Sequence, residues 1–591
     1  MKLGFSKNLM YKETDLFHRR LIFITAIFLL LAMVCFARLF QKQVLEHKSY
    51  LAMAKNQYFT QKDIPAKRGK IFAKEGVTTV SELGAKNKGL FPLATDIQEY
   101  QILAVPKNIK NREDTALKLS AILGMSKDEI FAQINNNKPY IPPLAKHLNK
   151  DKADQVAALN ITGVLTATEQ DRYYPEGSLA AHILGFVNFE GQGNYGLEGF
   201  YNDELKGFIG NLLAEKDTKG RFISIEGETA AQNGTDLVLT IDHNIQYMVE
   251  EKLKEGIKQY GAEGGTIIVQ NPKTGAILAM ASQPSFDPNQ FNQVPQEQQN
   301  VFSNPAIASS WEPGSVFKPI VMAAALDTGT VEPDTQGVFS NMTTVQGYEI
   351  HTAQDKAFGR ETMTQVLENS DNVAMVWVSE KLGKDNLYKY VRDFGFGDAS
   401  GIDLQGEAKG EVSDLKQWRD INRATISFGQ GIAVTPVQLI SAISTIANGG
   451  KLMKPYIVDK MVRYDGKEII TEPKQVRQVI KEETAQKLTA MLVSVVAKGH
   501  GKKAGVEGYK IAGKTGTAQI PNSSGGYEEK AHIGSFAGFF PADNPQISIL
   551  VKFIKPKNVE WAESSAAPVF GQLADWLISY YQIPPTPPAS L

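Results

Sequence analysis

One uninterrupted apolar run limits how the rest of this chain can be placed. It reads LIFITAIFLLLAMVCFA from Leu21 to Ala37, 17 residues without a charge, and arginine flanks it on both sides. As an α-helix the run is ~26 Å long at about 1.5 Å per residue, slightly shorter than the ~30 Å hydrocarbon core of a bilayer. Leu39 and Phe40 lengthen it, and Arg38 can extend its charge to the interface. The sequence therefore predicts one transmembrane helix over residues 21–40.

A cleaved signal peptide or a lipoprotein anchor would also explain such a run. No A-x-A cleavage site follows it, and Cys35 is preceded by Val34 rather than by a small residue. We therefore expect an uncleaved membrane anchor with a cytoplasmic tail at residues 1–20. The residues after the helix should be extracytoplasmic, because this is the one predicted helix that can carry them across the membrane. Basic residues before the run favour the same orientation: Lys2, Lys7, Lys12, Arg19 and Arg20.

Composition excludes several classes of function. The 591 residues include 63 basic and 64 acidic side chains, for a net charge of −1, so nothing electrostatic favours a nucleic-acid partner. A single cysteine excludes an internal disulfide and a cysteine cage for a metal. The eight histidines are scattered without an HExxH pattern, so we predict no metal and no cofactor.

The rest of the chain predicts two folded regions and a tail. Residues 41–235 are polar, with short alternating strands and amphipathic helices. Residues 236–582 begin with a strand, a helix and a hairpin at Gly264–Ser282, continue with helices, and end with strands and the helix Ala567–Tyr581. This order predicts an α+β domain whose sheet uses both ends of the segment. The proline-rich residues 583–591 predict a disordered tail.

A serine and a lysine stand at the start of a long apolar segment, WEPGSVFKPIVMAAALDTG. On a helix Ser315 and Lys318 are i and i+3 and share one face. Pro319 is tolerated only in the first helical turn, which places the helix start here. The segment that follows has almost no polar side, so the helix should run through a domain interior. A serine beside a lysine at such a position would make an activated nucleophile.

Two later motifs complete a chemical set. Ser370-Asp371-Asn372 precedes another apolar helix, and Lys514-Thr515-Gly516 lies in a strand between glycines, where a substrate backbone could approach closely. Each pattern alone occurs by chance, and the chain repeats each elsewhere. The repeats have the wrong context: one precedes the membrane helix, one is a hairpin turn and one is surrounded by charge. They are Ser6–Asn8, Lys273–Gly275 and Ser413–Lys416.

In this order the three motifs resemble those of penicillin-binding proteins and serine β-lactamases. The flanking segments are similar to class B penicillin-binding proteins, the monofunctional peptidoglycan D,D-transpeptidases, and the resemblance covers about residues 60–580. It implies a pedestal domain, elongated and of mixed α/β structure, at 41–235. It also implies a transpeptidase domain at 236–582, with an antiparallel sheet between helices and an all-helical subdomain. The segments are Lys67–Phe72, Arg172–Val187, Tyr195–Gly207, Ser427–Gly450 and Phe536–Val551.

The resemblance assigns roles to residues. Ser315 attacks the carbonyl between two terminal D-alanines of a donor stem peptide, an acceptor amine of a second stem peptide takes the acyl group, and β-lactams acylate the same serine. Lys318 is the base, Ser370 relays the proton and Asn372 binds the substrate amide. The carboxylate site is Lys514, Thr515, Gly516 and Thr517, and the backbone N–H groups of Ser315 and Thr517 form the oxyanion hole.

The role of Lys318 has an energetic requirement. A lysine with the ordinary pKa of about 10.4 is only about 0.04% neutral at pH 7. Lowering that pKa by about 3 units requires roughly 4 kcal/mol of preference for the neutral form. Burial under the apolar helix and repulsion from Lys514 are the expected sources.

Other classes fit less well. A class A β-lactamase needs a deacylating glutamate in an ExxLN context, which residues 407–418 lack. A bifunctional class A protein needs an EDxxFxxH-like glycosyltransferase site, and Glu113-Asp114 is followed by neither the phenylalanine nor the histidine. A β-lactam sensor or an inactive scaffold is disfavoured by the intact motifs. The chain departs from the family at FAKEG, where an Asp-Arg pair is usual, and at NVEWAESSAAPVF, which lacks a glycine pair.

The block at 394–413, with QWRDINRATISFGQG after it, resembles division (septal) members more than elongation members. The resemblance implies partners as well. A multipass glycosyltransferase of the shape, elongation, division and sporulation (SEDS) group supplies the glycan, and divisome proteins and a bacterial cytoplasmic membrane surround the chain.

Overall fold

The computed structural model describes residues 7–74, 89–216, 222–522 and 526–585. The chain forms two compact units, residues 1–66 with 208–232 and residues 67–207 with 233–591. Most of the predicted tail at 583–591 lies outside the described residues.

The first unit contains a long helix and a small sheet. Helix α1 (Lys7–Phe40) continues through a π-turn (Gln41–Leu45) into α2 (His47–Tyr58). The stretch Leu16–Leu45, which extends from α1 through the π-turn, contains an 18-residue window with a mean hydropathy of 2.5 and is the one candidate membrane span among the described residues. Strands β1 (Phe59–Ile64), β8 (Gly210–Lys216) and β9 (Phe222–Thr229) form an antiparallel sheet in the order β1-β8-β9.

The second unit has two large sheets. One has seven strands: β19 (Glu468–Ile470), β18 (Val458–Val462), β10 (Asp236–Asp242), β2 (Ile71–Lys74), β3 (Leu90–Ala104) and β4 (Ala145–Leu148) follow in that order, and β5 (Val164–Tyr173) pairs with β3. Strands β2 and β10 are parallel, so segments more than 160 residues apart share this sheet. Helices α3 (Arg112–Leu123), α4 (Lys127–Ile134) and α5 (Lys150–Ala158) contribute to a separate small core with β3 and β4.

The other sheet is the one that we predicted to form from both ends of residues 236–582. Its order is β12-β11-β23-β22-β21, with every pair antiparallel. Strands β11 (Gly264–Gln270) and β12 (Ile277–Gln283) form the predicted hairpin. Strands β21 (Ala512–Pro521), β22 (Tyr527–Phe540) and β23 (Ile547–Ile554) come from the far end of the segment.

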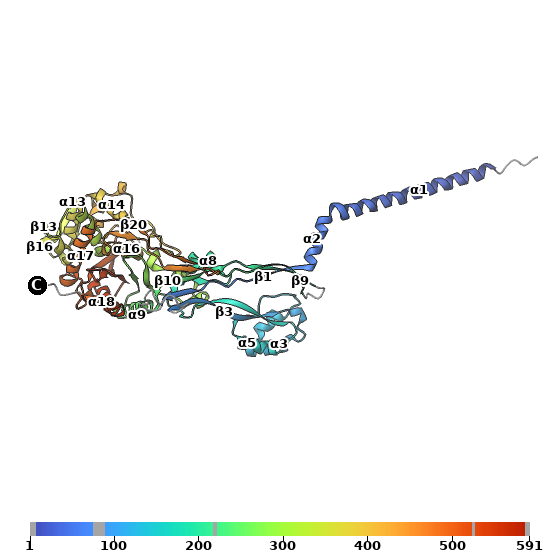
Figure 1. Cartoon of the computed structure of the whole chain (residues 1–591), viewed down its shortest axis with the longest axis horizontal. Helices are drawn as coiled ribbons and strands as arrows, with labels where there is room; N and C mark the ends of the chain where they lie inside the picture. The colour runs from blue at the N-terminus through green and yellow to red at the C-terminus, as the bar shows by residue number, and fades with distance from the viewer. Residues whose placement is uncertain (1–6, 75–88, 217–221, 523–525, 586–591) are drawn as a thin grey trace, which may run out of the picture. The chain divides into compact units, whose positions relative to one another are not determined.

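Helices cover both faces of this sheet because its strands are apolar on both sides. Phe536 and Val551 face one core with α9 (His243–Tyr260) and α18 (Ala566–Tyr580), which contact each other (Figure 1). Ala537 and Leu550 face the other core with α11 (Lys318–Asp327), α16 (Pro436–Ala447) and α17 (Glu482–Lys498). Neighbouring residues on these strands face opposite cores, because successive side chains of a β-strand point to opposite faces of the sheet. The α+β prediction is confirmed.

Three of the sequence segments that resembled the pedestal meet in one buried ion cluster. Glu198 is 0% exposed, and its Oε2 accepts a hydrogen bond of 2.7 Å from Arg68 Nε. Its Oε1 accepts from Arg172 Nε at 2.6 Å and from the Tyr174 hydroxyl at 3.3 Å. Burial alone would raise the pKa of Glu198, but Arg172 and Arg68 outweigh burial and hold the pKa below its ordinary value. The cluster joins β5 to the helix Gly196–Phe200.

Replacing Glu198 with alanine is expected to destabilise this unit by about 3–5 kcal/mol, because Arg68 would remain buried without a carboxylate partner and Arg172 would keep only Asp96. Denaturant unfolding of the full-length chain in detergent measures the change. The matched control is Asp203→Ala, since the Asp203 side chain is 82% exposed and pairs with Lys206, three residues away. That substitution should cost less than about 0.5 kcal/mol. Equal effects of the two variants would contradict a structural role for the cluster.

Candidate active site

Ser315 lies in a tight turn that leads directly into a buried helix. The 3₁₀ turn Gly314–Phe317 continues as α11, with Pro319 in the first helical turn as predicted. Residues Lys318–Leu326 are all buried, which confirms that this helix runs through the interior. The structure differs in one detail: the serine precedes the α-helix rather than starting it, because the backbone first forms the narrower turn.

The turn is enclosed by two other segments. The Gly314 N–H donates a 3.0 Å hydrogen bond to the Gly429 carbonyl, in the SFGQG segment at residues 427–431. Gly314 has a φ of +61°, and a Cβ added there would lie 3.2 Å from the Thr517 carbonyl oxygen. A larger residue would strain the backbone and crowd β21. Glycine therefore lets the serine turn lie directly against both the loop and the strand.

The amine of Lys318 is fully buried and points to the second motif. Its Nζ donates to the Ser370 carbonyl at 2.6 Å and to Asn372 Oδ1 at 2.8 Å, and it lies 3.2 Å from Ser370 Oγ. Burial and then the positive charge of Lys514 hold the pKa of Lys318 well below its ordinary value. These are the two causes expected from the sequence, and together they favour a neutral amine.

The second motif occupies the junction between two helices. Ser370 ends α12 (Met363–Asn369) in the left-handed region, with φ 57° and ψ 39°. Asp371 then caps α13 (Asn372–Leu382) by accepting from the Ala374 N–H at 2.9 Å. A non-glycine residue in this region costs of order 1 kcal/mol, so the surrounding contacts must hold it. The unusual turn aims Ser370 and Asn372 at Lys318.

The third motif lies on the edge strand β21. Lys514 is fully buried, and its Nζ donates to the carbonyl and Oγ1 of Thr515 at 3.2 and 3.3 Å. Burial lowers the pKa of Lys514 to about 7. A Cβ on Gly516 would lie 2.9 Å from the Pro313 carbonyl oxygen, so this strand approaches the serine turn backbone to backbone. The Thr517 Oγ1 accepts from the Ala562 N–H at 3.1 Å.

The competing motifs have different surroundings. The Ser413 carbonyl accepts from Trp418 Nε1, and Lys416 lies in an isolated 3₁₀ turn rather than in a buried helix. Lys273 is exposed in the turn between β11 and β12, where its Nζ donates to Asn544 Oδ1 at 2.6 Å. Ser6 lies outside the described residues. Within the described part of the chain, the set at 315, 370 and 514 is the one that the fold brings together.

Sequence reasoning missed two acidic residues beside this set. Glu361 and Asp371 are 2% and 0% exposed, and both act on the pKa of Lys318. Asp371 was visible only as the middle letter of a motif, and no local pattern marks Glu361. Sequence reasoning also gave no role to Glu312, although it lies in the EPGS segment that was quoted. Its carboxylate accepts hydrogen bonds from the Gly431 N–H at 2.8 Å and from the Tyr527 hydroxyl at 3.1 Å.

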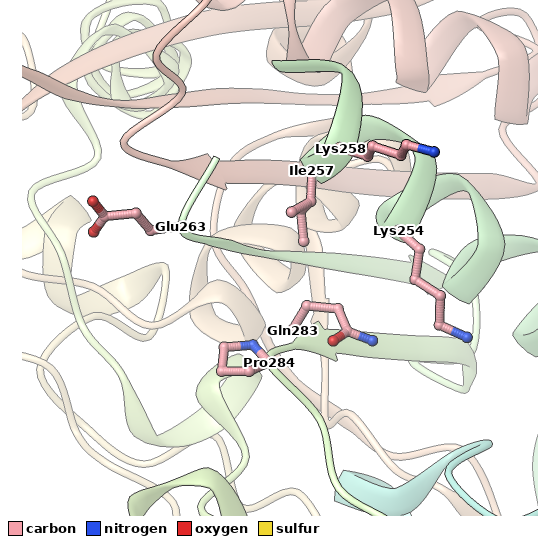
Figure 2. A pocket seen from close by; sticks show the side chains of 6 residues that line it. All are labelled: Lys254, Ile257, Lys258, Glu263, Gln283 and Pro284. Atoms are coloured by element: carbon pink, nitrogen blue, oxygen red, sulfur yellow. The ribbon is translucent and has the colours of Figure 1, made fainter. Parts of the chain in front are cut away.

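A small hollow elsewhere in the unit is separate from these residues. Figure 2 shows six lining side chains from α9, from the end of β12 and from the segment before β11. None of the predicted site residues lines the hollow, so it plays no part in the serine chemistry. The lining residues are Lys254, Ile257, Lys258, Glu263, Gln283 and Pro284.

Comparisons with known proteins identify the same family. The model of the penicillin binding protein transpeptidase domain matches residues 265–575, and that of the penicillin-binding protein dimerisation domain matches residues 63–239. The chain is 34% identical to stage V sporulation protein D of Bacillus subtilis, over 94% of this chain and 84% of the relative. It is 32% identical to the peptidoglycan D,D-transpeptidase FtsI of Escherichia coli, over 84% and 82% of the two chains.

A solved structure gives the same result. Penicillin-binding protein 3 of Mycobacterium tuberculosis, complexed with ampicillin, is 28% identical and superposes with a TM-score of 0.69, over 90% of this chain and 98% of the other. The chain belongs to the class B penicillin-binding proteins.

The low pKa of Lys514 predicts a pH dependence. The family resemblance implies that Lys514 binds the substrate carboxylate, which requires a protonated amine, so the second-order rate of acylation by a penicillin should then fall as pH rises through about 7. Stopped-flow or gel-based labelling of the full-length chain measures this alkaline limb of the pH–rate profile. An arginine at this position stays charged, so Lys514→Arg should lose the alkaline limb, although its rate should be lower throughout. A wild-type rate that does not fall above neutral pH would contradict this role.

Proposed function

We propose that this peptidoglycan D,D-transpeptidase forms its acyl-enzyme on Ser315, with Lys318 as the base. The observation that carries the proposal is the buried amine of Lys318, which is hydrogen-bonded to Ser370 and Asn372. Lys318 itself lies one helical turn after Ser315. The relatives support the reaction class, since one is named a peptidoglycan D,D-transpeptidase and another binds ampicillin.

In the first half-reaction Ser315 Oγ attacks the carbonyl carbon of the D-alanyl-D-alanine bond. Its proton passes to Lys318 Nζ, and the backbone N–H groups of Ser315 and Thr517 stabilise the oxyanion. The C–N bond then breaks, and the leaving D-alanine amine receives the proton through the Ser370 hydroxyl. Lys514, Thr515 and Thr517 hold the terminal carboxylate, and the close approach at Gly516 brings that strand to the serine.

In the second half-reaction an amine from a neighbouring stem peptide attacks the ester. Its proton leaves through Ser370 to Lys318, and the Ser315 oxygen leaves with a proton returned by Lys318. The product is an amide cross-link, and the serine is regenerated. A β-lactam follows the first half-reaction, but its leaving amine stays attached to the acyl group after the ring opens, which obstructs the acceptor.

The direct test supplies the full-length chain in detergent with a donor peptide ending in D-alanyl-D-alanine and a peptide bearing a free amine. Mass spectrometry should detect the cross-linked product and one released D-alanine for each cross-link, and penicillin should block both. Rapid turnover of penicillin without a cross-link would indicate a β-lactamase. Absence of both reactions, and of penicillin labelling, would indicate a scaffold.

The family resemblance of residues 394–413 and 417–431 supports a cellular role. We infer a role in septal wall synthesis, with an elongation role as the alternative. In the living bacterium a fluorescent fusion should concentrate at the division site, whereas uniform labelling of the side wall would favour elongation.

Topology and partners belong to the same proposal. The apolar stretch of α1 would cross the cytoplasmic membrane once, with the N-terminus inside and the catalytic unit outside. A SEDS-type polymerase would supply the glycan strands, together with divisome proteins. Crosslinking from the membrane segment of the full-length chain should capture a multipass protein, and a failure to capture one would contradict this partner.

A further inference from the structure

Two carboxyl groups are buried beside the predicted catalytic lysine. Glu361 lies on β16 (Gly359–Thr362) and is 2% exposed, while Asp371 stands between Ser370 and Asn372 and is 0% exposed. Acidic side chains this deep are normally matched by a cation or by several hydrogen-bond donors. The hydrogen-bond donors around these two carboxyl groups therefore indicate how their charge is balanced.

Each carboxyl group uses one of its two oxygens. Glu361 Oε1 accepts from Asn369 Nδ2 at 2.7 Å, and Asp371 Oδ1 accepts from the Ala374 N–H at 2.9 Å. The other two oxygens, Glu361 Oε2 and Asp371 Oδ2, are shielded from water and receive no hydrogen bond from the described residues. In each carboxyl group, one oxygen accepts a hydrogen bond that stabilises the turn around Ser370. The other oxygen has no hydrogen-bond donor among the described residues.

The Asn369 amide that bonds to Glu361 is two residues from Asp371, so the turn brings the two carboxyl groups next to each other. The two carboxyl groups are close enough for a mutual hydrogen bond, which requires a proton on one of them. Burial, with a further contribution from Asp371, raises the pKa of Glu361 to about 7, against the lowering effect of Asn369 and Lys318. A single shared proton gives both unmatched oxygens a partner.

The charge of the pair acts on Lys318. Burial and Lys514 favour the neutral amine, whereas Asp371 and Glu361 favour the protonated one. The neighbouring His351 contributes its backbone carbonyl, which accepts from Asn372 Nδ2 at 3.0 Å, while its ring is exposed and faces Asp355 and Glu349. The carboxyl pair is thus the anionic counterpart of Lys514 in setting the protonation of Lys318.

We propose that Glu361 and Asp371 share one proton and act as a single monoanion, which positions the Ser370–Asn372 turn and sets the protonation of Lys318. This inference rests on the proposed function of Lys318 as the base. Two negative charges would hold a proton on the amine before reaction. One charge leaves the amine able to lose its proton and then stabilises the ammonium that forms when the proton moves from Ser315 Oγ to Lys318 Nζ. Glu361 and Asp371 are positioning residues, since neither touches the reacting atoms.

The test measures the midpoint of the acidic limb in the pH profile of penicillin acylation, using the full-length chain. Glu361→Gln and Asp371→Asn each keep one negative charge and replace the shared proton by an amide donor. Each single variant should therefore keep the wild-type midpoint. The double variant carries no charge beside Lys318, so its midpoint should fall by about one pH unit, the effect of removing one nearby opposite charge.

Three results would overturn the proposal. A lower midpoint in both single variants would mean that the wild-type pair carries two charges. An unchanged midpoint in the double variant would mean that the pair does not act on Lys318. A uniform loss of rate at every pH would mean that the two residues are only structural. Failure of the proposed function is distinguishable, because the wild-type chain itself would then show no acylation at Ser315.

Two controls complete the design. Glu332→Gln changes an exposed glutamate that pairs with Lys487, and it should leave the profile unchanged. If the double variant does not fold, infrared spectra provide an independent measurement near neutral pH. The carbonyl band of a protonated buried carboxylic acid should be present in the wild-type chain and absent from both single variants. Its absence from the wild-type chain would also overturn the shared proton.

Discussion

Replacing Ser315 with alanine is expected to reduce covalent labelling by a fluorescent penicillin to background. The Ser315 hydroxyl is the proposed attacking group, and alanine at this position leaves Lys318 without the hydroxyl proton that it is proposed to accept. The fold should be unaffected: Ser315 Oγ makes no hydrogen bond to the described residues, so the change in stability should stay within about 0.5 kcal/mol. Gel fluorescence of the full-length chain, with a thermal melt of each variant, measures both quantities.

Ser413→Ala is the matched control, since Ser413 heads the competing serine–lysine pattern. We expect full labelling of that variant. Labelling that persists in Ser315→Ala, or that disappears in Ser413→Ala, would contradict the assignment of the nucleophile. Peptide mapping of the labelled wild-type chain should place the adduct on the peptide that contains Ser315.

Replacing Lys318 with methionine is expected to lower the second-order rate of penicillin acylation at least about 10³-fold, within the range that general-base catalysis contributes. Methionine fills much the same apolar space but cannot accept the serine proton. It also leaves the Ser370 carbonyl and Asn372 Oδ1 without their donor, at a stability cost of about 1–3 kcal/mol. Single-turnover labelling at a series of penicillin concentrations separates the loss of rate from a loss of binding.

The chain offers a close control for this experiment. Lys552 on β23 is also buried, burial also lowers its pKa to about 7, and its Nζ lies 4.2 Å from the centre of the Trp311 ring. Lys552→Met therefore removes a second buried amine without touching the proposed machinery, and acylation should stay within a few-fold of wild type. Equal losses in the two variants would show that the effect comes from folding rather than from proton transfer.

Local patterns were sufficient to predict much of the fold. The hairpin at Gly264–Ser282 and the closing helix could be predicted because apolar period and turn residues act over short distances. Ser315 and Lys318 could be paired because a helical turn fixes their relation whatever the remaining structure. The parallel pairing of β2 with β10 could not be predicted, since strand partners so far apart carry no local signal.

The same limit applies to the site. Asp371 was part of a motif, but no local pattern indicates that Glu361, on β16, acts on the same lysine as Asp371. Arg68, Arg172 and Glu198 were each inside a segment with a family resemblance, yet their shared ion cluster depends on tertiary packing. Sequence thus predicts which residues are chemically notable, while the fold decides which of them act on one another.

The strand order of the five-stranded sheet has a consequence for the order of events during synthesis. Strand β11 has β12 on one side and β23 on the other, and about 260 residues separate β12 from β23. Until the ribosome has made β23, β11 presents an unpaired edge, which can pair with the wrong partner. Lys514 is also synthesised late, on β21, so a nascent chain that already contains Ser315 and Lys318 still lacks the proposed carboxylate site. The enzyme therefore becomes competent for cross-linking only after its last strands have been synthesised and have joined the sheet.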